Sequence, residues 1–124
     1  MPTLPLDADN FQATITDNAT VIVDFWAPWC GPCRNFAPTF EAAAEKRPDI
    51  VFAKVNTEEQ QAIAAAFNIR SIPTLMIFRD QIAIYSEAGA LAPAGFDQLI
   101  EQAMALDMDQ VRKKIAGQSP SDAT

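Results

Sequence analysis

The chain has 124 residues, which suffices for one domain with a single hydrophobic core and is too short for two. Its 49% content of hydrophobic residues argues against disorder, and its 16 acidic and 9 basic residues leave a net charge of −7. This charge argues against nucleic acid or an anionic membrane surface as a partner, because both recruit basic patches.

The beginning of the chain predicts a strand, a helix and a second strand. Residues 4–6 favour a short leading strand, and capping residues between positions 7 and 10 indicate a short helix that ends near Thr16. Residues 21–27 are mostly β-branched or aromatic, a composition typical of a strand buried on both faces. Asp24 lies inside this strand, where a charged residue is unexpected.

The middle of the chain continues the alternation of helix and strand. Apolar residues spaced three and four apart predict a helix over residues 30–47, which continues through Pro38. Residues 50–56 predict a second buried strand. The sequence Thr57-Glu58-Glu59-Gln60 matches a capping box and predicts that a helix begins there and ends near Asn68.

The last part of the chain predicts a hairpin and a long helix. Residues 74–78 and 82–85 read as two antiparallel strands, because the turn between them is short. A helix begins near Pro93, with apolar spacing that extends to Ile115, and residues 117–124 are expected to fray. Together these elements predict an α/β fold with a mixed β-sheet and helices on both faces.

The chain contains only two cysteines, and they are separated by a glycine and a proline in Cys30-Gly31-Pro32-Cys33. A zinc site needs four ligands, and the chain offers two thiols and no histidine, so only a site shared between two chains remains as a metal alternative. A structural disulfide over so short a loop would remove little chain entropy. A redox-active pair explains the spacing best.

The placement of the pair supports redox chemistry. Cys30 follows a predicted strand and a Pro-Trp turn, so it should lie at the N-terminus of the next helix, where the helix dipole favours a thiolate. Cys33 should lie one turn further and be more buried. We therefore expect Cys30 to be the nucleophile and Cys33 the resolving thiol, with Gly31 allowing a tight backbone and Pro32 stiffening it.

The sequence resembles the thioredoxin family over residues 11–105. The resemblance rests on six segments in the family's order: residues 23–27, 29–34, 37–38, 54–56, 69–75 and 89–91. It implies a thioredoxin fold, with a central mixed β-sheet flanked by helices, as a single domain over residues 1–106. Residues 107–124 would form a C-terminal helical extension and a tail. The hairpin turn lacks the glycine that is usual in the family, which leaves its turn type open.

The resemblance also implies roles for residues around the cysteines. Asp24 matches a buried acid that helps to move the proton of Cys33, and burial in an apolar strand should raise the pKa of this carboxyl. The alternative is an acid satisfied by a neighbouring lysine, and Lys54 matches the family's partner for it. Pro73 matches a cis-proline that faces the disulfide, whereas the residues alone favour a trans proline that opens a strand.

The same resemblance implies a surface for protein substrates. Ile72 would offer backbone groups to an extended substrate segment. Arg34 replaces a lysine that is common in the family and keeps its positive charge. The residues that match the flat apolar contact surface are Pro28, Trp29, Gly89 and Ala90.

The expected function is that of a thiol–disulfide oxidoreductase that reduces disulfides in client proteins. The resemblance implies regeneration by a thioredoxin reductase and a place in electron transport and cell redox homeostasis. We expect no cofactor of its own, because the chain has no glycine-rich phosphate loop, and we expect a monomer. No export signal is visible, which favours the cytoplasm. A disulfide-forming oxidase or isomerase and a binding module without redox activity are the alternatives.

Overall fold

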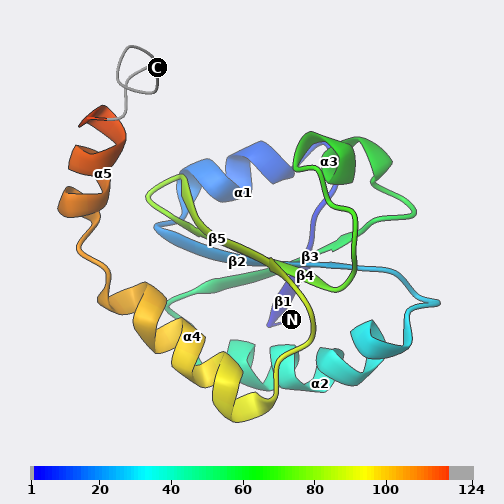
Figure 1. Cartoon of the computed structure of the whole chain (residues 1–124). Coiled ribbons are helices and arrows are strands. Elements are labelled where there is room, and N and C mark those ends of the chain that lie inside the picture. Colours follow the sequence, from blue (N-terminus) through cyan, green and yellow to red (C-terminus); the bar gives the residue numbers. More distant parts are fainter. Residues whose placement is uncertain (1, 118–124) are drawn as a thin grey trace.

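The computed structural model describes residues 2–117 and arranges them around one five-stranded β-sheet (Figure 1). The predicted hairpin and leading strand are both present. In chain order the elements are β1 (Thr3–Pro5), α1 (Phe11–Asp17), β2 (Thr20–Trp26), α2 (Gly31–Lys46), β3 (Val51–Asn56), α3 (Gln61–Ala66), β4 (Thr74–Arg79), β5 (Ile82–Ala88), α4 (Pro93–Ala105) and α5 (Met108–Gly117).

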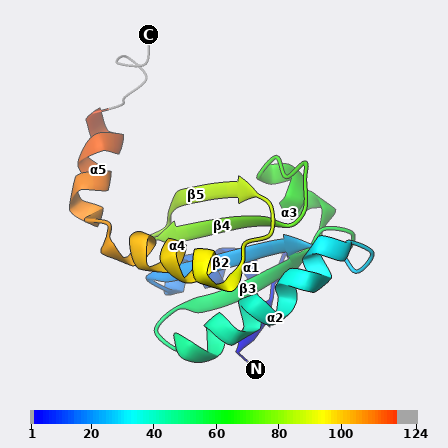
Figure 2. The ribbon, with the colours of Figure 1, turned by 60° about the horizontal axis from the view of Figure 1, so that its bottom comes forward.

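The sheet is mixed, as the sequence predicts. Its strand order is β1-β3-β2-β4-β5, with β3 parallel to both β1 and β2. Strand β4 is antiparallel to β2 and to β5, and a short turn joins β4 to β5 as a hairpin (Figure 2). Strand β2 therefore lies at the centre of the sheet, and the chain leaves its carboxyl end to enter α2.

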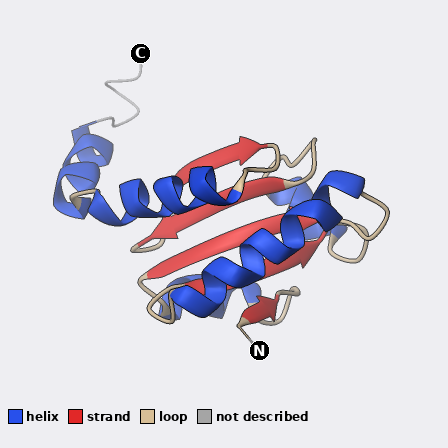
Figure 3. Cartoon of the chain, turned by 90° about the horizontal axis from the view of Figure 1, so that it is seen from below, coloured by secondary structure: helices blue, strands red, loops and turns tan. Residues whose placement is uncertain are grey.

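Helices cover both faces of the sheet. Helices α1 and α3 lie on one face, and α2 and α4 lie on the other (Figures 1 and 3). Each face has its own hydrophobic core. Phe36, Phe40, Phe52 and Phe96 pack together beneath α2 and α4, and Phe25, Val55 and Met76 belong to the core beneath α1 and α3.

Strand β2 is buried along almost its whole length, which explains why its sequence shows no alternation of apolar and polar residues. Val23 and Phe25 contribute to the core beneath α1 and α3, whereas Ile22 contributes to the core beneath α2 and α4. Because side chains alternate along a strand, Asp24 has the same orientation as Ile22 and points to the face that α2 covers.

The predicted start of α3 is wrong. Residues 57–59 form turns, and the helix begins only at Gln61, without a side-chain cap. The Thr57 hydroxyl donates instead to the carbonyl oxygen of Trp26 at 3.1 Å, and the Thr57 amide binds the same oxygen at 2.8 Å. Thr57 therefore ties the end of β3 to the end of β2 and is not available as a capping residue. Asn68, near which the helix was predicted to end, has a left-handed backbone conformation, with φ of 57°.

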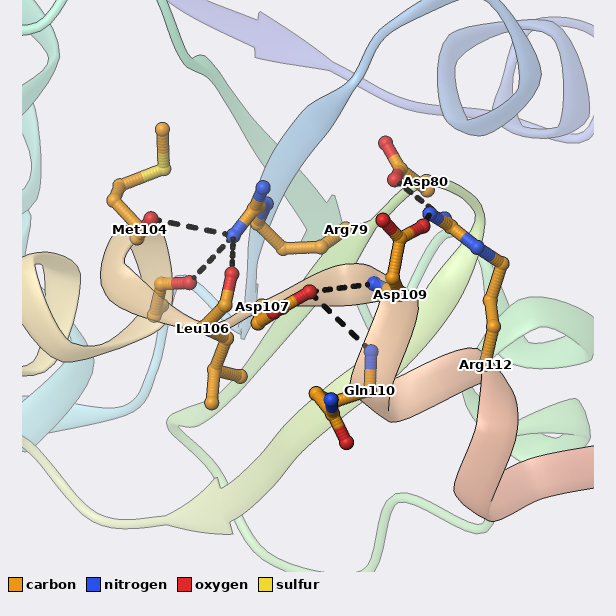
Figure 4. Close-up of polar contacts among 9 residues, drawn as sticks. Arg79, Asp80, Met104, Leu106, Asp107, Asp109, Gln110 and Arg112 are labelled. Atoms are coloured by element: carbon orange, nitrogen blue, oxygen red, sulfur yellow. Dashed lines mark hydrogen bonds and ion pairs between the residues drawn. The ribbon is translucent and has the colours of Figure 1, made fainter. Parts of the chain in front are cut away.

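The predicted long C-terminal helix is broken in two. Helix α4 ends at Ala105, and α5 begins at Met108, after a break at Leu106 and Asp107. The carboxylate of Asp107 accepts hydrogen bonds from the amides of Asp109 and Gln110, at 3.0 and 3.3 Å, and so caps a new helix (Figure 4). The apolar spacing that runs across the break concealed it in the sequence.

Arg79, the last residue of β4, binds the C-terminal end of α4. The Nη1 atom of Arg79 donates to the carbonyl oxygens of Ala103, Met104 and Leu106 at 2.9, 3.4 and 3.2 Å (Figure 4). These carbonyls lie at the C-terminal end of the helix, where carbonyl groups attract a cation; the Ala103 carbonyl also accepts the Leu106 amide at 3.4 Å.

Fraying was predicted for residues 117–124. Gly117 is instead the last residue of α5, and residues 118–124 lie outside the described residues.

The hairpin turn and α5 are joined by an ion pair. Asp80 and Gln81 have φ of 51° and 69°, so the turn between β4 and β5 has two left-handed residues although neither is glycine. The Asp80 carboxylate contacts Arg112 Nη1 at 2.9 Å, and Arg112 also pairs with Asp109 (Figure 4). An aspartate tolerates this backbone conformation and offers α5 a charge that glycine would lack.

Candidate active site

The two cysteines lie where the sequence predicts, at the junction of β2 and α2. Cys30 is the N-cap of α2, and its amide donates to the carbonyl oxygen of Ala27 at 3.2 Å. Gly31 and Pro32 form the first turn of the helix. The amide of Cys33 donates to Cys30 Sγ at 3.2 Å, so the start of the helix directs a backbone N–H group at this sulfur.

Cys30 and Cys33 are joined in a disulfide, with their Cα atoms 5.2 Å apart. Only 4% of Cys30 and 2% of Cys33 is exposed to solvent, so burial scarcely separates the two residues. Their positions do separate them, because Cys30 lies at the positive end of α2 and Cys33 lies one turn inside it. After reduction, the helix end would favour a thiolate at Cys30 over one at Cys33.

The loop before β4 packs against the disulfide. The peptide bond between Ile72 and Pro73 is cis, as the family resemblance implies, and the Ile72 carbonyl oxygen lies 3.7 Å from Cys30 Sγ. Trp26 and Ile72 also pack against a small buried cluster that contains both cysteines. This loop therefore forms one wall of the site, although it lies about forty residues away in sequence.

The residues predicted to form the apolar contact surface are exposed to solvent. Trp29 has 64% of its surface exposed, an unusual fraction for a large aromatic residue, and Pro28 is exposed beside it. Gly89 and Ala90 are exposed as well, and the Gly89 amide donates to the Pro73 carbonyl oxygen at 2.8 Å. This bond holds the segment after β5 against the Ile72-Pro73 loop, with Gly89 at φ of 117°.

Asp24 is fully buried on the face of the sheet that α2 covers. Within the described residues, neither of its carboxylate oxygens has a hydrogen-bond partner. Burial raises the pKa of Asp24 to about 7, and the positive charge of Lys54 opposes this shift without cancelling it. A carboxyl group with this pKa exchanges a proton near neutral pH.

The structure does not support the alternative that a lysine satisfies this acid by direct contact. Lys54 lies opposite Asp24 in the ladder between β2 and β3. Its Nζ atom lies over the ring of Trp26, 4.8 Å from the ring centroid, in a cation–π contact. Lys54 therefore acts on Asp24 through its electric field, while its ammonium group packs against the tryptophan.

Two contacts near the site, besides that of Lys54 with Trp26, were missed from the sequence. Arg34 Nη1 donates to the carbonyl oxygen of Pro28 at 2.9 Å, a bond from α2 back to the loop that precedes it. The bonds from Thr57 to Trp26 also lie at the carboxyl end of β2. The positive charge at position 34 was the only signal for the first contact, and no sequence pattern indicated the second.

Within residues 2–117, no group of three or more His, Cys, Asp or Glu side chains is arranged to hold a metal ion. None of the helices described there is both long and apolar enough to span a membrane. The geometry offers the chemistry of the cysteine pair, with a buried carboxyl group on the strand behind it.

Comparisons with known proteins identify a family and relatives to which the chain is similar. A family model described as "Thioredoxin" matches residues 2–102. The chain is 54% identical over 116 residues to "Putative thioredoxin 2" of Streptomyces coelicolor, an alignment that covers 94% of this chain and 87% of the relative. It is 39% identical over 100 residues to "Thioredoxin C-3" of Corynebacterium nephridii, covering 80% and 69% of the two chains.

Solved structures agree with the sequence comparisons. The structure of a mutant thioredoxin from Halobacterium salinarum superposes with a TM-score of 0.77 at 33% identity, covering 85% of this chain and 93% of that one. Oxidised thioredoxin from Plasmodium falciparum superposes with a TM-score of 0.75 at 33% identity, covering 83% and 99%. The mixed sheet with helices on both faces is thus the thioredoxin fold.

Proposed function

The chain belongs to the thioredoxin family and is a thiol–disulfide oxidoreductase, and we propose that it reduces client proteins by a two-step exchange in which Cys30 attacks and Cys33 resolves. The observation that carries this proposal is the position of the pair. One sulfur lies at the N-cap of α2, where it accepts a backbone hydrogen bond, and the other lies one turn deeper. The two thiols therefore differ in the environment that activates them.

In the first step, the Cys30 thiolate attacks one sulfur of a client disulfide. The client S–S bond breaks, a mixed disulfide forms between Cys30 and the client, and the released client thiolate takes up a proton. In the second step, Cys33 loses its proton and attacks Cys30 Sγ. The bond between Cys30 and the client breaks, and the second client thiol leaves. The client gains two electrons, and the Cys30–Cys33 disulfide closes.

We propose that Asp24 accepts the proton that Cys33 loses in the second step. The carboxyl group points to the face of the sheet where α2 carries Cys33, and its pKa of about 7 lets it accept a proton at neutral pH. The positive charge of Lys54, on the neighbouring strand β3, lowers the pKa of this carboxyl group. Gly31 and Pro32 shape the first helical turn that holds the two sulfurs within bonding distance.

We assign client binding to the exposed surface around the disulfide. An extended client segment would lie along the loop at Ile72, as strand addition would require. Its side chains would contact the apolar surface beside the disulfide. This surface comprises Pro28, Trp29, Gly89 and Ala90, which are exposed, and part of Ile72.

Regeneration of the dithiol requires two electrons from outside the chain. On the family resemblance, we assign this role to a thioredoxin reductase that draws on NADPH. The nucleotide would bind to that enzyme, since this sequence contains no glycine-rich phosphate loop. The protein would then act as a monomer in the cytoplasm, as an electron carrier in cell redox homeostasis. We propose residues 1–106 as the redox domain and residues 107–124 as an extension that takes no part in the chemistry.

Trapping of the mixed disulfide tests the order of attack. With insulin as the client, a Cys33→Ser variant should accumulate a covalent complex through Cys30, visible by mass spectrometry. A Cys30→Ser variant, the matched control, should accumulate little or none. If Cys30→Ser forms the complex and Cys33→Ser does not, the roles are reversed. A coupled assay with NADPH and a thioredoxin reductase tests regeneration separately.

A further inference from the structure

We propose that Arg34 is a positioning residue that holds the loop between β2 and α2, and with it Trp29, in the arrangement that client proteins bind. The inference rests on the proposed use of Trp29 in client binding. Its starting point is the hydrogen bond from Arg34 Nη1 to the Pro28 carbonyl oxygen, 2.9 Å long. The bond involves neither sulfur atom, so it is available in both redox states.

Within the described residues, Pro28 and Trp29 have few other restraints, although Ala27 before them is fully buried. The Cys30 amide binds the Ala27 carbonyl at 3.2 Å, but Pro28 has no N–H group with which to anchor its own peptide. Trp29 exposes 64% of its surface, so core packing does little to hold it. The carbonyl oxygen of Pro28 belongs to the peptide group that leads into Trp29. Holding that oxygen restricts the orientation of this peptide plane, and with it the position of the Trp29 Cα atom from which the side chain leaves.

Arg34 connects the start of α2 to this loop. Its amide donates to the Cys30 carbonyl at 3.1 Å, as the first intrahelical bond of α2, and its guanidinium reaches back to Pro28. One residue thereby joins the rigid first turn of the helix to the exposed loop. A hydrogen bond with a charged donor is stronger than one between neutral groups, and the planar guanidinium is well suited to hold a fixed direction.

A positioning role and a simple charge effect predict different results. A charge near Cys30 would favour its thiolate and would speed the attack on every disulfide, large or small. A held loop matters only for a substrate that touches Trp29. The two explanations separate when a protein client is compared with a small uncharged disulfide that has no surface to dock.

The test compares Arg34→Met with Lys46→Met, a control that removes one positive charge from the other end of the same helix, where Lys46 pairs only weakly with Asp97 at 3.9 Å. With insulin as the client, we expect Arg34→Met to raise KM about threefold to tenfold and leave kcat nearly unchanged. With 2-hydroxyethyl disulfide, the second-order rate constant should not change. Lys46→Met should match the parent protein in both assays.

Equal slowing on both substrates would overturn the proposal in favour of a charge effect, and an unchanged KM for insulin would overturn it outright. If the parent protein itself failed to reduce insulin, the proposed function would fail instead. A second measurement needs no variant. In the unaltered protein, the Nη protons of Arg34 should exchange with solvent more slowly in NMR spectra than those of Arg70, and equal exchange would contradict the bond to Pro28.

Discussion

Asp24 and Lys54 lie opposite one another on β2 and β3, yet the ammonium group of Lys54 lies over the ring of Trp26 while both oxygens of Asp24 lack hydrogen-bond partners within the described residues. The acid is therefore buried without the direct partner that would normally stabilise its charge. This arrangement keeps the pKa of Asp24 near 7 and has consequences for both stability and catalysis.

The first prediction concerns stability against pH. The pKa of Asp24 rises from 3.8 to about 7 on folding, so between these values the native state holds a proton that the unfolded state has lost. Stability therefore falls as pH rises, and this group should remove about 2 to 3 kcal/mol between pH 5 and pH 8. Asp24→Asn should abolish this dependence. Urea unfolding of the oxidised parent protein and variant at pH 5 and pH 8 measures the free energy of unfolding. An equal change with pH in the two proteins would contradict the raised pKa of Asp24.

The second prediction concerns the resolving step. Asp24→Asn removes the group that we assign to the Cys33 proton, so release of the client from the mixed disulfide should slow by about 100-fold at pH 7. The loss should shrink at higher pH, because Cys33 then ionises without help. Stopped-flow measurement of mixed-disulfide decay against pH tests this expectation. A defect of constant size at every pH would assign a purely structural role to Asp24.

The third prediction concerns Lys54. Its positive charge lowers the pKa of Asp24, so Lys54→Met should raise that pKa above its present value of about 7. The carboxyl carbon of Asp24, followed by NMR across the pH range, reports the change directly. Lys46→Met is again the control, because Lys46 lies on the surface at the end of α2 and should leave the titration of Asp24 unchanged.

The fourth prediction compares two arginines at the C-terminal end of the fold. Arg79 binds three carbonyl oxygens at the end of α4, so Arg79→Met should lower the free energy of unfolding by about 1 to 3 kcal/mol. Arg112 forms solvent-exposed ion pairs with Asp80 and Asp109, so Arg112→Met should have a much smaller effect. Urea unfolding of both variants gives the comparison, and an equal or larger loss for Arg112→Met would contradict it.

The fifth prediction concerns the C-terminal extension. Helix α5 lies at the opposite end of the sheet from the loop that carries Cys30 (Figures 1 and 2). A chain that ends at Leu106 should therefore reduce insulin at the rate of the full chain. It should be less stable, because Met108 is buried against the domain. Loss of activity in a truncated chain that remains folded would show that the extension takes part in function.

The sequence predicted the sheet and most of its helices because their patterns are local and strong. The continuous apolar run of β2 and the spaced apolar face of α2 each indicate their element without knowledge of the rest. The two errors have different causes, a contact with another strand and a helix cap hidden by the apolar spacing. Thr57 binds the carbonyl of Trp26 instead of capping α3, and Asp107 starts a new helix inside a continuous apolar pattern.

The site was predictable in part. The spacing and position of Cys30 and Cys33 indicated redox chemistry without any comparison, and the charge of Asp24 in a buried strand identified it as unusual. The cis peptide bond before Pro73 came from the family resemblance, since residue preferences alone favour trans. The contacts of Lys54 with Trp26 and of Arg34 with Pro28 depend on side-chain placement, which no pattern in the sequence encodes.

The most direct test of the account is the reduction potential of the Cys30–Cys33 pair. The protein would be equilibrated against a series of glutathione redox buffers, with the fluorescence of Trp26 and Trp29 as the signal for each redox state. Each difference of about 30 mV changes the equilibrium constant tenfold, so a reductant and an oxidant are well separated. We predict a potential below that of glutathione, as a protein-disulfide reductase requires. A potential above it would contradict the account and indicate an enzyme that forms or rearranges disulfides.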